Sequence, residues 1–503
     1  MSTQSVIVIG GGIAGLTAGA LLAHEGQKVI ILEAHLQPGG CAGTFRRGPY
    51  IFDVGATQVA GLEHGGIHDR IFRYLKSPAP VATILDPACV VNLGDDSESI
   101  VLWHSQKKWE NEREKHFPDS QLFWSLCSAL HKSNWSFAAN DPVLPWQTFW
   151  DLKQFFKASR LMNFVSGIFS KSSMADLLWL CSCAHDQRLR KFLDLQLKLY
   201  SQQPADSTAA LYGATVLQMA QAPLGLWHLK GSMQKLSDNL LTPFRRDGGS
   251  LLLGHKVVGL ELNATSKLWQ VDVRKHKGTT LRFQAEHLIC TLPPQCLLNL
   301  MSRNSCLPKE YEQRIQELSQ PSGAIVFYGA LERRHLPLHH SSHLQLMLNN
   351  PGPLFISISQ DGDGRAPLGQ ATVIASTFAD SDFWTSCIDI DYQKHKEITL
   401  NNILQALHST LNIDLRCWLH KELATPKSFA RWTGRPKGIV GGLGQTPSNF
   451  GPFGLSSRTP MKNLWLCGDS IYPGEGTAGV SQSSLMVCRQ LMAMKGRELH
   501  LPR

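Results

Sequence analysis

Three glycines near the start of the chain have the spacing of a motif that binds the pyrophosphate of a dinucleotide. Gly10, Gly12 and Gly15 fit the pattern G-x-G-x-x-G. In this pattern the first glycine allows a tight turn, the second lets the backbone approach the pyrophosphate, and the third lets a helix pack closely on a strand. Glu33 lies about twenty residues further on, where a carboxylate accepts hydrogen bonds from a ribose and disfavours the 2′-phosphate of NADP.

The elements around these glycines come in the order that the motif requires. Residues 5–9 read Ser-Val-Ile-Val-Ile, a β-branched run typical of a strand buried on both faces. A helix is expected over residues 16–24, so the backbone N–H groups of Ile13 and Ala14, which lead into it, would face the phosphates. A second strand is expected over residues 28–32. The pattern predicts a dinucleotide-binding βαβ unit.

The segment after Glu33 indicates FAD rather than NAD. Gly39 and Gly40 follow within a few residues, and an aromatic strand, Tyr50-Ile51-Phe52-Asp53, comes next. An NAD-binding domain would normally continue into another βαβ crossover here, whereas a glycine pair suits a loop pressed against an extended cofactor. A plain β-hairpin is the alternative interpretation.

A second candidate cofactor-binding segment lies near the C-terminus. Residues 463–467 are expected to form a buried strand, followed by Gly468, Asp469, a glycine-rich turn and a helix over residues 481–494. Asp469 would bind hydroxyl groups of the flavin ribityl chain or those close to the phosphates, unless it only caps the turn. Backbone N–H groups at Gly479 and Val480 would face the pyrimidine oxygens of the flavin.

The composition excludes several other classes of protein. The net charge of +9 over 503 residues is spread along the chain, whereas a nucleic-acid-binding protein concentrates its basic residues on one face or stretch. The 12 cysteines include no C-x-x-C pair, so neither a zinc site nor a disulfide scaffold is expected. Free thiols indicate that the protein works in a reducing compartment. No metal site is predicted. No signal peptide and no membrane-spanning apolar run is evident.

Several of these landmarks resemble the flavin amine oxidase superfamily, and their spacing resembles its carotenoid desaturase and isomerase branch. They are Gly10–Gly15, Glu33, Gly39-Gly40, Asp53-Val54-Gly55 and Gly468-Asp469. The resemblance covers nearly the whole chain and is weakest over residues 76–224. It implies an α/β fold, with a Rossmann-type FAD-binding domain of glutathione-reductase-like topology and an inserted α+β substrate domain. It also implies that Val257, on an expected strand over residues 254–260, lies near the adenine.

The same resemblance implies how the chain divides into domains. The FAD-binding domain would be discontinuous and would take residues 1–75, 225–300 and 425–503. The substrate domain, which would also face a membrane, would take residues 76–224 and 301–424. Residues 433–460 are rich in glycine and proline and are expected to form a long ordered loop near the active site.

The reaction that the resemblance implies is desaturation of a carotenoid. The C-terminal turn, residues 468–479, resembles the cyanobacterial group, and within it the C-3′,4′ desaturases of myxoxanthophyll biosynthesis. Cis–trans isomerisation of a carotenoid with reduced FAD is the alternative, and amine oxidation is a further one. Amine oxidases often attach flavin to a cysteine in a Gly-Gly-Cys tripeptide near the C-terminus, and this chain has no such tripeptide there.

Two residues are candidate bases. In a desaturation, oxidised flavin accepts a hydride from an allylic C–H, and the neighbouring carbon loses a proton. Glu475 lies in the glycine-rich turn beside the expected flavin site, and His228 lies in the segment 227–233 that is expected to return to the FAD domain. A solvated loop glutamate and a structural histidine are the alternative interpretations. A developing polyene cation is itself acidic, so no dedicated base is required.

The middle of the chain is rich in aromatic residues. Residues 100–180 hold seven of the 13 tryptophans, with Phe155, Phe156, Phe164 and Phe169 and the lysines Lys153, Lys157 and Lys171 among them. This pattern suits a membrane-interface patch, the lining of a long apolar tunnel, or an aromatic core. We expect the protein to lie peripherally on the cytoplasmic face of a membrane and to take its carotenoid from lipid. A quinone or oxygen would reoxidise the flavin.

Overall fold

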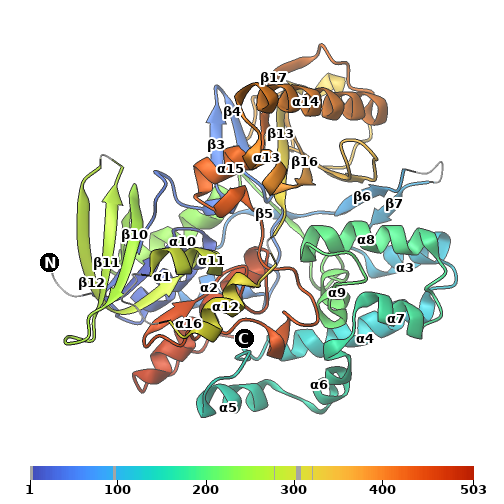
Figure 1. Ribbon diagram of the computed structural model, residues 1–503. Coiled ribbons are helices and arrows are strands. Elements are labelled where there is room, and N and C mark those ends of the chain that lie inside the picture. Colours follow the sequence, from blue (N-terminus) through green and yellow to red (C-terminus); the bar gives the residue numbers. More distant parts are fainter. Residues whose placement is uncertain (1–3, 95–97, 277, 302–306, 320) are drawn as a thin grey trace.

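The structure, a computed structural model, describes residues 4–94, 98–276, 278–301, 307–319 and 321–503. Its first sheet forms around the β-branched N-terminal run (Figure 1), in which Val6 to Ile9 are all buried. β1 (Gln4–Ile9) pairs in parallel with β2 (Val29–Leu32) on one side and with β12 (Thr280–Cys290) on the other. The strand order is β10-β11-β12-β1-β2-β9, and β18 also pairs with β12. The other strands are β9 (Ser250–Leu252), β10 (His255–Leu262), β11 (Trp269–Lys275) and β18 (Leu464–Leu466).

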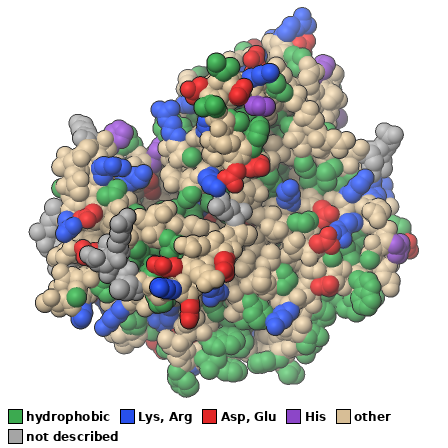
Figure 2. Space-filling view, viewed as in Figure 1, with side chains coloured by type: hydrophobic (Ala, Val, Ile, Leu, Met, Phe, Trp, Pro, Cys, Tyr) green, Lys and Arg blue, Asp and Glu red, His purple; other side chains and the backbone are tan. Residues whose placement is uncertain are grey.

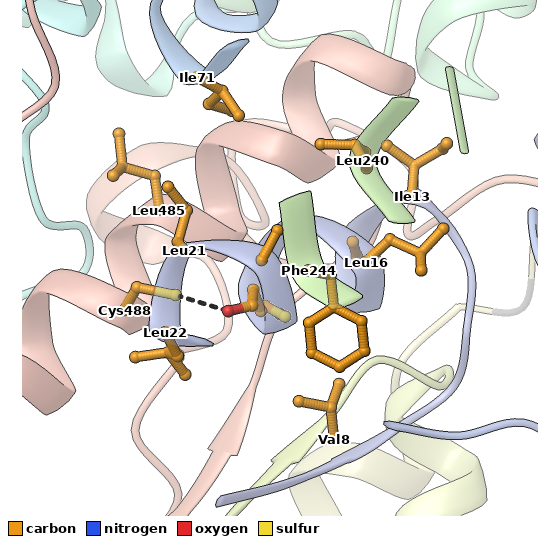
Figure 3. Packing of buried hydrophobic residues seen from close by; sticks show 14 of the residues in the cluster. Val8, Ile13, Leu16, Leu21, Leu22, Ile71, Leu240, Phe244, Leu485 and Cys488 are labelled. Atoms are coloured by element: carbon orange, nitrogen blue, oxygen red, sulfur yellow. Dashed lines mark hydrogen bonds between the residues drawn. The ribbon is translucent and has the colours of Figure 1, made fainter. Parts of the chain in front are cut away.

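Helices pack on this sheet through an apolar core that Figure 3 shows from close by. α1 (Ile13–His24) contacts both α16 (Thr477–Met494) and α10 (Gln234–Arg246). Cys488 of α16 donates a hydrogen bond to the carbonyl of Ala18, with a sulfur–oxygen distance of 3.6 Å. α1 is buried nearly all round and carries almost no polar face. Only three residues separate the end of β1 at Ile9 from the start of α1 at Ile13, so the N-terminus of the helix lies close to the end of the strand.

Both of the helices expected at the cofactor begin earlier than their sequences predict. α1 starts at Ile13 rather than at residue 16, and α16 starts at Thr477 rather than at residue 481. The glycines and alanines in these first turns resembled loop residues in the sequence, yet tertiary packing holds them in helical conformation. The consequence is that the first-turn amides of each helix lie directly at the glycine-rich turn that precedes it.

A second sheet is built from the middle of the chain and lies apart from the first (Figure 1), with the strand order β17-β13-β16-β15-β14-β6-β7. The helix α14 (Asp389–Leu411) packs on it through Ile403 and Leu407. Its strands are β6 (Cys89–Asn92), β7 (Ile100–Leu102), β13 (Gly323–Glu332), β14 (His343–Leu346), β15 (Leu354–Ile358), β16 (Gln370–Ala379) and β17 (Trp418–Ala424).

A helical layer adjoins the second sheet and surrounds an aromatic core. Trp109 and Trp124 are buried there and meet edge to face, with ring centroids 5.7 Å apart, and Phe192 packs beside them. The helices are α3 (Gln106–His116), α4 (Gln121–Ala138), α5 (Phe149–Ala158), α6 (Leu161–Ser166), α7 (Met174–Leu180), α8 (Gln187–Ser201) and α9 (Ala210–Val216). Among the described residues, no helix is long and apolar enough to cross a membrane.

Short elements complete the fold and connect its parts. β3 (Thr44–Arg47) pairs with β4 (Tyr50–Asp53), and β5 (Ala82–Ile84) pairs with β8 (Trp227–Leu229). The remaining helices are α2 (Ile67–Tyr74), α11 (Pro294–Leu300), α12 (Lys309–Gln316), α13 (Ser381–Ser386) and α15 (Pro426–Thr433), and the short 3₁₀ turns are η1 (Gly40–Ala42), η2 (Gly167–Lys171), η3 (Arg333–His335), η4 (Pro436–Gly438) and η5 (Gly451–Phe453). The predicted boundaries between the two domains stay a prediction.

Candidate functional site

One large cavity, of about 1120 Å³, lies where the two sheets and the helical layer meet. One part of its wall is glycine-rich backbone from the turns before α1 and α16. Another part is apolar and aromatic, and comes from α4, α9 and the second sheet. The cavity therefore joins a surface suited to phosphates and sugars with a surface suited to an apolar molecule.

The N-terminus of α1 forms a floor of bare backbone in this cavity. Gly12 caps the helix without a side-chain hydrogen bond, and the next amides, those of Ile13 and Ala14, are first-turn amides that have no partner inside the helix. A Cβ added to Gly12 would meet only the Cα of Gly40, at 3.9 Å. Gly12, Ile13, Ala14, Gly39 and Gly40 all line the cavity. The free amides and the open space fit a pyrophosphate.

The other two glycines of the motif have the mechanical roles that their spacing predicts. Gly10 has a φ of +106° and allows the turn from β1 into α1. Gly15 packs so close to the carbonyl of Gly10 that any Cβ there would collide with it. Gly10 lines the cavity, whereas Gly15 lies behind it in the core.

Glu33 lies at the end of β2, where a ribose would bind. One carboxylate oxygen accepts a hydrogen bond from the amide of Gly11 at 2.6 Å, and the other accepts one from the amide of His35 at 2.7 Å. These two bonds fix the carboxylate at the cavity wall beside the glycine turn. Each carboxylate oxygen has further lone pairs, so both can also accept hydrogen bonds from ribose hydroxyls.

The C-terminal turn forms the neighbouring wall. A Cβ on Gly468, which has a φ of +119°, would lie 4.0 Å from the Cβ of Ala14, so this turn meets the first turn of α1. The Asp469 carboxylate pairs with Arg435. Gly479 and Val480 also line the cavity, but the amide of Val480 already donates to the carbonyl of Gly476. The amide of Gly479 has no partner inside the helix and can face a ligand.

Val257 and His228 lie outside the cavity lining. Val257 is buried on β10 at an irregular step in its pairing with β11. His228 is buried on β8, where its Nε2 atom is 2.9 Å from Oδ2 of Asp363 and 3.1 Å from Nη1 of Arg365. Arg365 in turn pairs with Asp53. His228 thus lies in a buried charge cluster with Asp363, Arg365 and Asp53. This cluster connects β4, which ends at Asp53, to the loop between β15 and β16 of the second sheet.

Glu475, in contrast, faces the cavity. Its Oε2 atom accepts a hydrogen bond from the amide of Gly442 at 3.0 Å and lies 3.4 Å from the Nε2 donor of Gln202. Burial raises the pKa of Glu475 to about 8. Its carboxyl is therefore mostly protonated at neutral pH and becomes a stronger base than an exposed glutamate once it ionises.

The apolar part of the cavity comes from the aromatic middle of the chain. Trp135 and Ala138 of α4 and Tyr212 and Val216 of α9 line it, and further apolar residues surround them. The latter are Met219, Phe355, Met347, Leu354, Phe450 and Tyr472. Among the described residues, no group of three or more His, Cys, Asp or Glu side chains is arranged to hold a metal ion.

Several residues of the site carry no signal in the sequence. Arg435 meets Asp469, and Gln202 meets Glu475, from distant segments. The expected glycine-rich loop over residues 433–460 does reach the cavity, through Val440, Gly441 and Phe450. A lone arginine in such a loop, or a lone glutamine such as Gln202 at the end of α8, has no spacing that marks it in the sequence.

Comparisons with known proteins agree with this geometry. The family described as "Flavin containing amine oxidoreductase" matches residues 13–492. A prolycopene isomerase of Daucus carota is 25% identical over 99% of this chain and 81% of its own length. An all-trans-retinol 13,14-reductase of Danio rerio is 21% identical over 96% of this chain and 86% of its own length.

Solved structures share the fold. Putrescine oxidase bound to putrescine covers 99% of this chain and 100% of its own, with 17% identity and a TM-score of 0.65. The structure of an oxidoreductase from Methanosarcina mazei matches 96% of this chain and 99% of its own, with 16% identity and a TM-score of 0.63. The expected α/β class, with a Rossmann-type cofactor domain and a mixed substrate domain, is confirmed.

Proposed function

Because this chain belongs to the flavin-containing amine oxidoreductase family and is an FAD-dependent oxidoreductase, we propose that it introduces a C=C bond into a carotenoid. The observation that carries this proposal is the position of Glu475. Its carboxyl lines the cavity and interacts electrostatically with Asp469 of the glycine-rich wall, which fits FAD, and with Tyr212 of the aromatic wall, which suits a polyene. When bound, the flavin supplies an acceptor for a hydride.

The chemistry balances with the residues of this chain. The substrate loses a hydride from one allylic carbon and a proton from its neighbour, and a C=C bond forms between them. The ionised Glu475 carboxylate takes the proton. Gly442 holds that carboxylate by its amide, and Gln202 lies beside it, so the group is fixed at the cavity wall. The aromatic wall excludes water and aligns a long apolar chain.

We assign the bond to the C-3′,4′ position of a precursor in myxoxanthophyll biosynthesis. The support is the resemblance of the C-terminal turn, which includes Gly468, Asp469, Glu475 and Gly479. A quinone or oxygen is proposed as the final electron acceptor, because two electrons must leave the flavin after each turnover.

Cis–trans isomerisation is the second candidate, and the relatives favour it. Prolycopene isomerases match this chain over nearly its whole length. Isomerisation needs reduced flavin and leaves the mass of the carotenoid unchanged. Amine oxidation is a further alternative, which rests on the wider family and on the fold shared with putrescine oxidase.

We also propose that the protein docks on a membrane through an exposed apolar patch on α5, α6, η2 and α7. Figure 2 shows hydrophobic side chains gathered along the lower edge of the molecule, over α5 and α6. Basic residues lie among them, and an anionic lipid surface attracts such residues. The patch consists of Phe149, Phe156, Leu161, Met162, Phe164, Val165, Ile168, Trp179 and Leu180, with Lys153, Lys157, Arg160 and Lys171.

The membrane patch lies against the wall of the cavity. Asn163 of α6 donates a hydrogen bond to the carbonyl of Ser133 on α4 at 2.7 Å, and the next residue, Asn134, donates to the carbonyl of Leu211 on α9 at 2.7 Å. Asn134 and Trp135 line the cavity. A carotenoid gains nothing by entering water, where each CH₂-sized unit costs about 0.8 kcal/mol. Entry from the bilayer across this wall avoids that cost.

The proposal is tested with FAD-reconstituted protein and membranes that carry candidate carotenoids, under anaerobic conditions. With oxidised flavin, we expect a product that has lost two hydrogens and absorbs at longer wavelength. Product of unchanged mass with altered chromatographic retention, formed only after the flavin is reduced beforehand, would establish the isomerase and overturn the desaturase. Oxidation of an amine in the same preparation, with no change in any carotenoid, would overturn both.

A further inference from the structure

Arg435 is a partly buried cation in the wall of the cofactor cavity, on the loop between α15 and η4. Its side chain is 13% exposed, and its Nη2 atom pairs with the Asp469 carboxylate, which is 14% exposed. Its Nη1 atom donates to the carbonyl of Gly441 at 2.6 Å. Although burial opposes the charge, Asp469 raises the pKa of Arg435 above its ordinary value, so the guanidinium stays charged.

Two further segments of the expected FAD-binding domain, η1 and α11, lie within electrostatic reach of Arg435. Its charge acts on Cys41, which directly follows Gly40, and on Cys296 at the start of α11. A Cβ on Gly40 would lie 3.3 Å from the Cα of Gly12, at the N-terminus of α1. Asp469, the ion-pair partner of Arg435, directly follows Gly468, where a Cβ would lie 4.0 Å from the Cβ of Ala14 in the first turn of α1. The guanidinium is therefore held beside the turn that meets the N-terminus of α1.

The hydrogen bonds of Arg435 leave donors for a ligand. A guanidinium carries five N–H donors in a planar fork. Its contacts with the described residues Gly441 and Asp469 use two of them. The remaining donors belong to a side chain that lines the cavity, and a planar fork matches two oxygens of a phosphate.

Other arginines of the cavity wall are engaged elsewhere. Arg47 pairs with Glu422 of β17, at 2.6 Å. Arg70 forms two hydrogen bonds with Asp141, at 3.0 and 2.7 Å. Arg435 is paired as well, but with a residue that itself belongs to the cofactor wall. The helix N-terminus contributes only about half a positive charge, whereas the pyrophosphate of FAD carries two negative charges.

We propose that Arg435 binds the pyrophosphate of FAD, while its bond to Asp469 fixes the guanidinium in the cavity wall. This inference rests on the cofactor alone and is independent of whether the substrate is a carotenoid. The role of Arg435 is thus to add the cation that the glycine-rich turn lacks, from a segment more than 390 positions further along the chain.

The test is a titration of the full-length apoprotein with FAD, ADP and riboflavin, followed by calorimetry. ADP carries the pyrophosphate without the flavin, and riboflavin carries the flavin without any phosphate. For Arg435→Gln, we expect FAD and ADP to bind roughly 10- to 100-fold more weakly, because a hydrogen bond to a charged group is lost. Riboflavin should bind as it does to the wild type. Arg435→Lys should recover part of the loss, because a point charge remains without the fork.

The matched control is Arg47→Gln, which removes another carboxylate-paired arginine of the same cavity and should leave the FAD and ADP affinities within about twofold. Unchanged ADP affinity in Arg435→Gln would overturn the proposal, and so would an equal loss for FAD and riboflavin, which would place Arg435 at the flavin ring. If Arg435→Gln does not fold, as judged by circular dichroism, Arg435→Lys decides the question: a weaker ADP affinity with an unchanged riboflavin affinity is expected, and an unchanged ADP affinity overturns the proposal.

Discussion

The Oε2 atom of Glu475 accepts a hydrogen bond from the amide of Gly442 at 3.0 Å. The residue before Gly442 gives its carbonyl to Arg435, which pairs with Asp469. One dipeptide, Gly441-Gly442, therefore connects the carboxyl proposed to accept the proton with the carboxylate proposed to hold the cofactor. Through this connection, a glycine-rich loop fixes the positions of both carboxylates.

Replacement of Glu475 tests its role as the base. Because burial raises its pKa to about 8, the carboxylate form gains population as the pH rises toward 8. We predict that wild-type desaturation increases through this range and levels off above it. Glu475→Gln should be slower by roughly 10²- to 10⁴-fold and should lose this pH dependence. Steady-state rates from pH 6 to 9, at saturating FAD, measure both effects.

Folding stability gives an independent check on the same pKa. The folded-state pKa of Glu475 is higher than its ordinary value of 4.5, so its contribution to stability is fully present below pH 4.5 and is lost as the pH rises through about 8. We therefore expect Glu475→Gln to become more stable relative to the wild type between pH 5 and pH 9. If the difference in melting temperature between Glu475→Gln and the wild type does not change with pH, Glu475 has an ordinary pKa. In the rate experiment, a desaturation rate that falls toward pH 8 would exclude Glu475 as the base.

A Cβ at Gly441 should disturb Glu475 directly. Gly441 has a φ of +72°, and a Cβ there would collide with the carboxylate of Glu475 and with the side chain of Gln202. Gly441→Ala should lower turnover by at least about tenfold, since small misplacements of a catalytic group are costly. Gly496 has a φ of +69° with nothing within 4 Å of an added Cβ. Gly496→Ala shares the backbone strain and should keep wild-type turnover; equal losses in both variants would leave no role for the contact with Glu475.

Replacement of two glycines of the N-terminal motif by alanine should have different effects, one on FAD binding and the other on folding. A Cβ at Gly12 projects into open space beside Gly40, so Gly12→Ala should fold normally but bind FAD at least about 100-fold more weakly. A Cβ at Gly15 collides with the carbonyl of Gly10, so Gly15→Ala should lose the folded state. Thermal unfolding of the apoproteins and titration with FAD distinguish the two. Tight FAD binding by Gly12→Ala would mean that the pyrophosphate lies elsewhere.

Local patterns predicted the cofactor-binding fold well, because each part has a short-range signature. The glycine spacing, the run of β-branched residues in β1 and the acidic end of β2 all act within forty residues of the N-terminus. The expected helix starts were late, because Ala14 and Ala478 carry no sign that tertiary packing keeps them helical. Arg435 could not be found, since its partner Asp469 lies 34 positions away, in no repeating pattern.

The tryptophans of the aromatic middle segment lie in three different environments. Trp109 and Trp124 form a core, Trp135 lines the cavity, and Trp179 is 76% exposed. Composition alone cannot separate these roles, because each depends on which face of a helix meets which neighbour. The surroundings of His228 could not be predicted from the sequence either, because its partners Asp363 and Arg365 lie more than 130 positions away.

Membrane docking is tested by adding negative charge to the exposed apolar patch on α5, α6, η2 and α7. The triple variant Phe149→Glu, Leu161→Glu and Ile168→Glu should sediment with anionic phospholipid vesicles at least about tenfold less than the wild type, because it removes apolar anchors and adds repulsion. Leu338→Glu, Leu368→Glu and Ile390→Glu form the control, since these residues are 82–97% exposed on other elements. Equal loss in both variants would indicate a general charge effect rather than a docking surface.

Single-turnover spectroscopy tests the central claim most directly. The oxidised holoenzyme is mixed anaerobically with vesicles that carry the carotenoid, and flavin and pigment absorbance are recorded together. We predict that the flavin bleaches and the pigment shifts to longer wavelength with the same rate constant, one carotenoid for each flavin, and that Glu475→Gln slows both. A pigment that changes its spectrum while the flavin stays oxidised, or that reacts only with flavin reduced beforehand, would contradict desaturation.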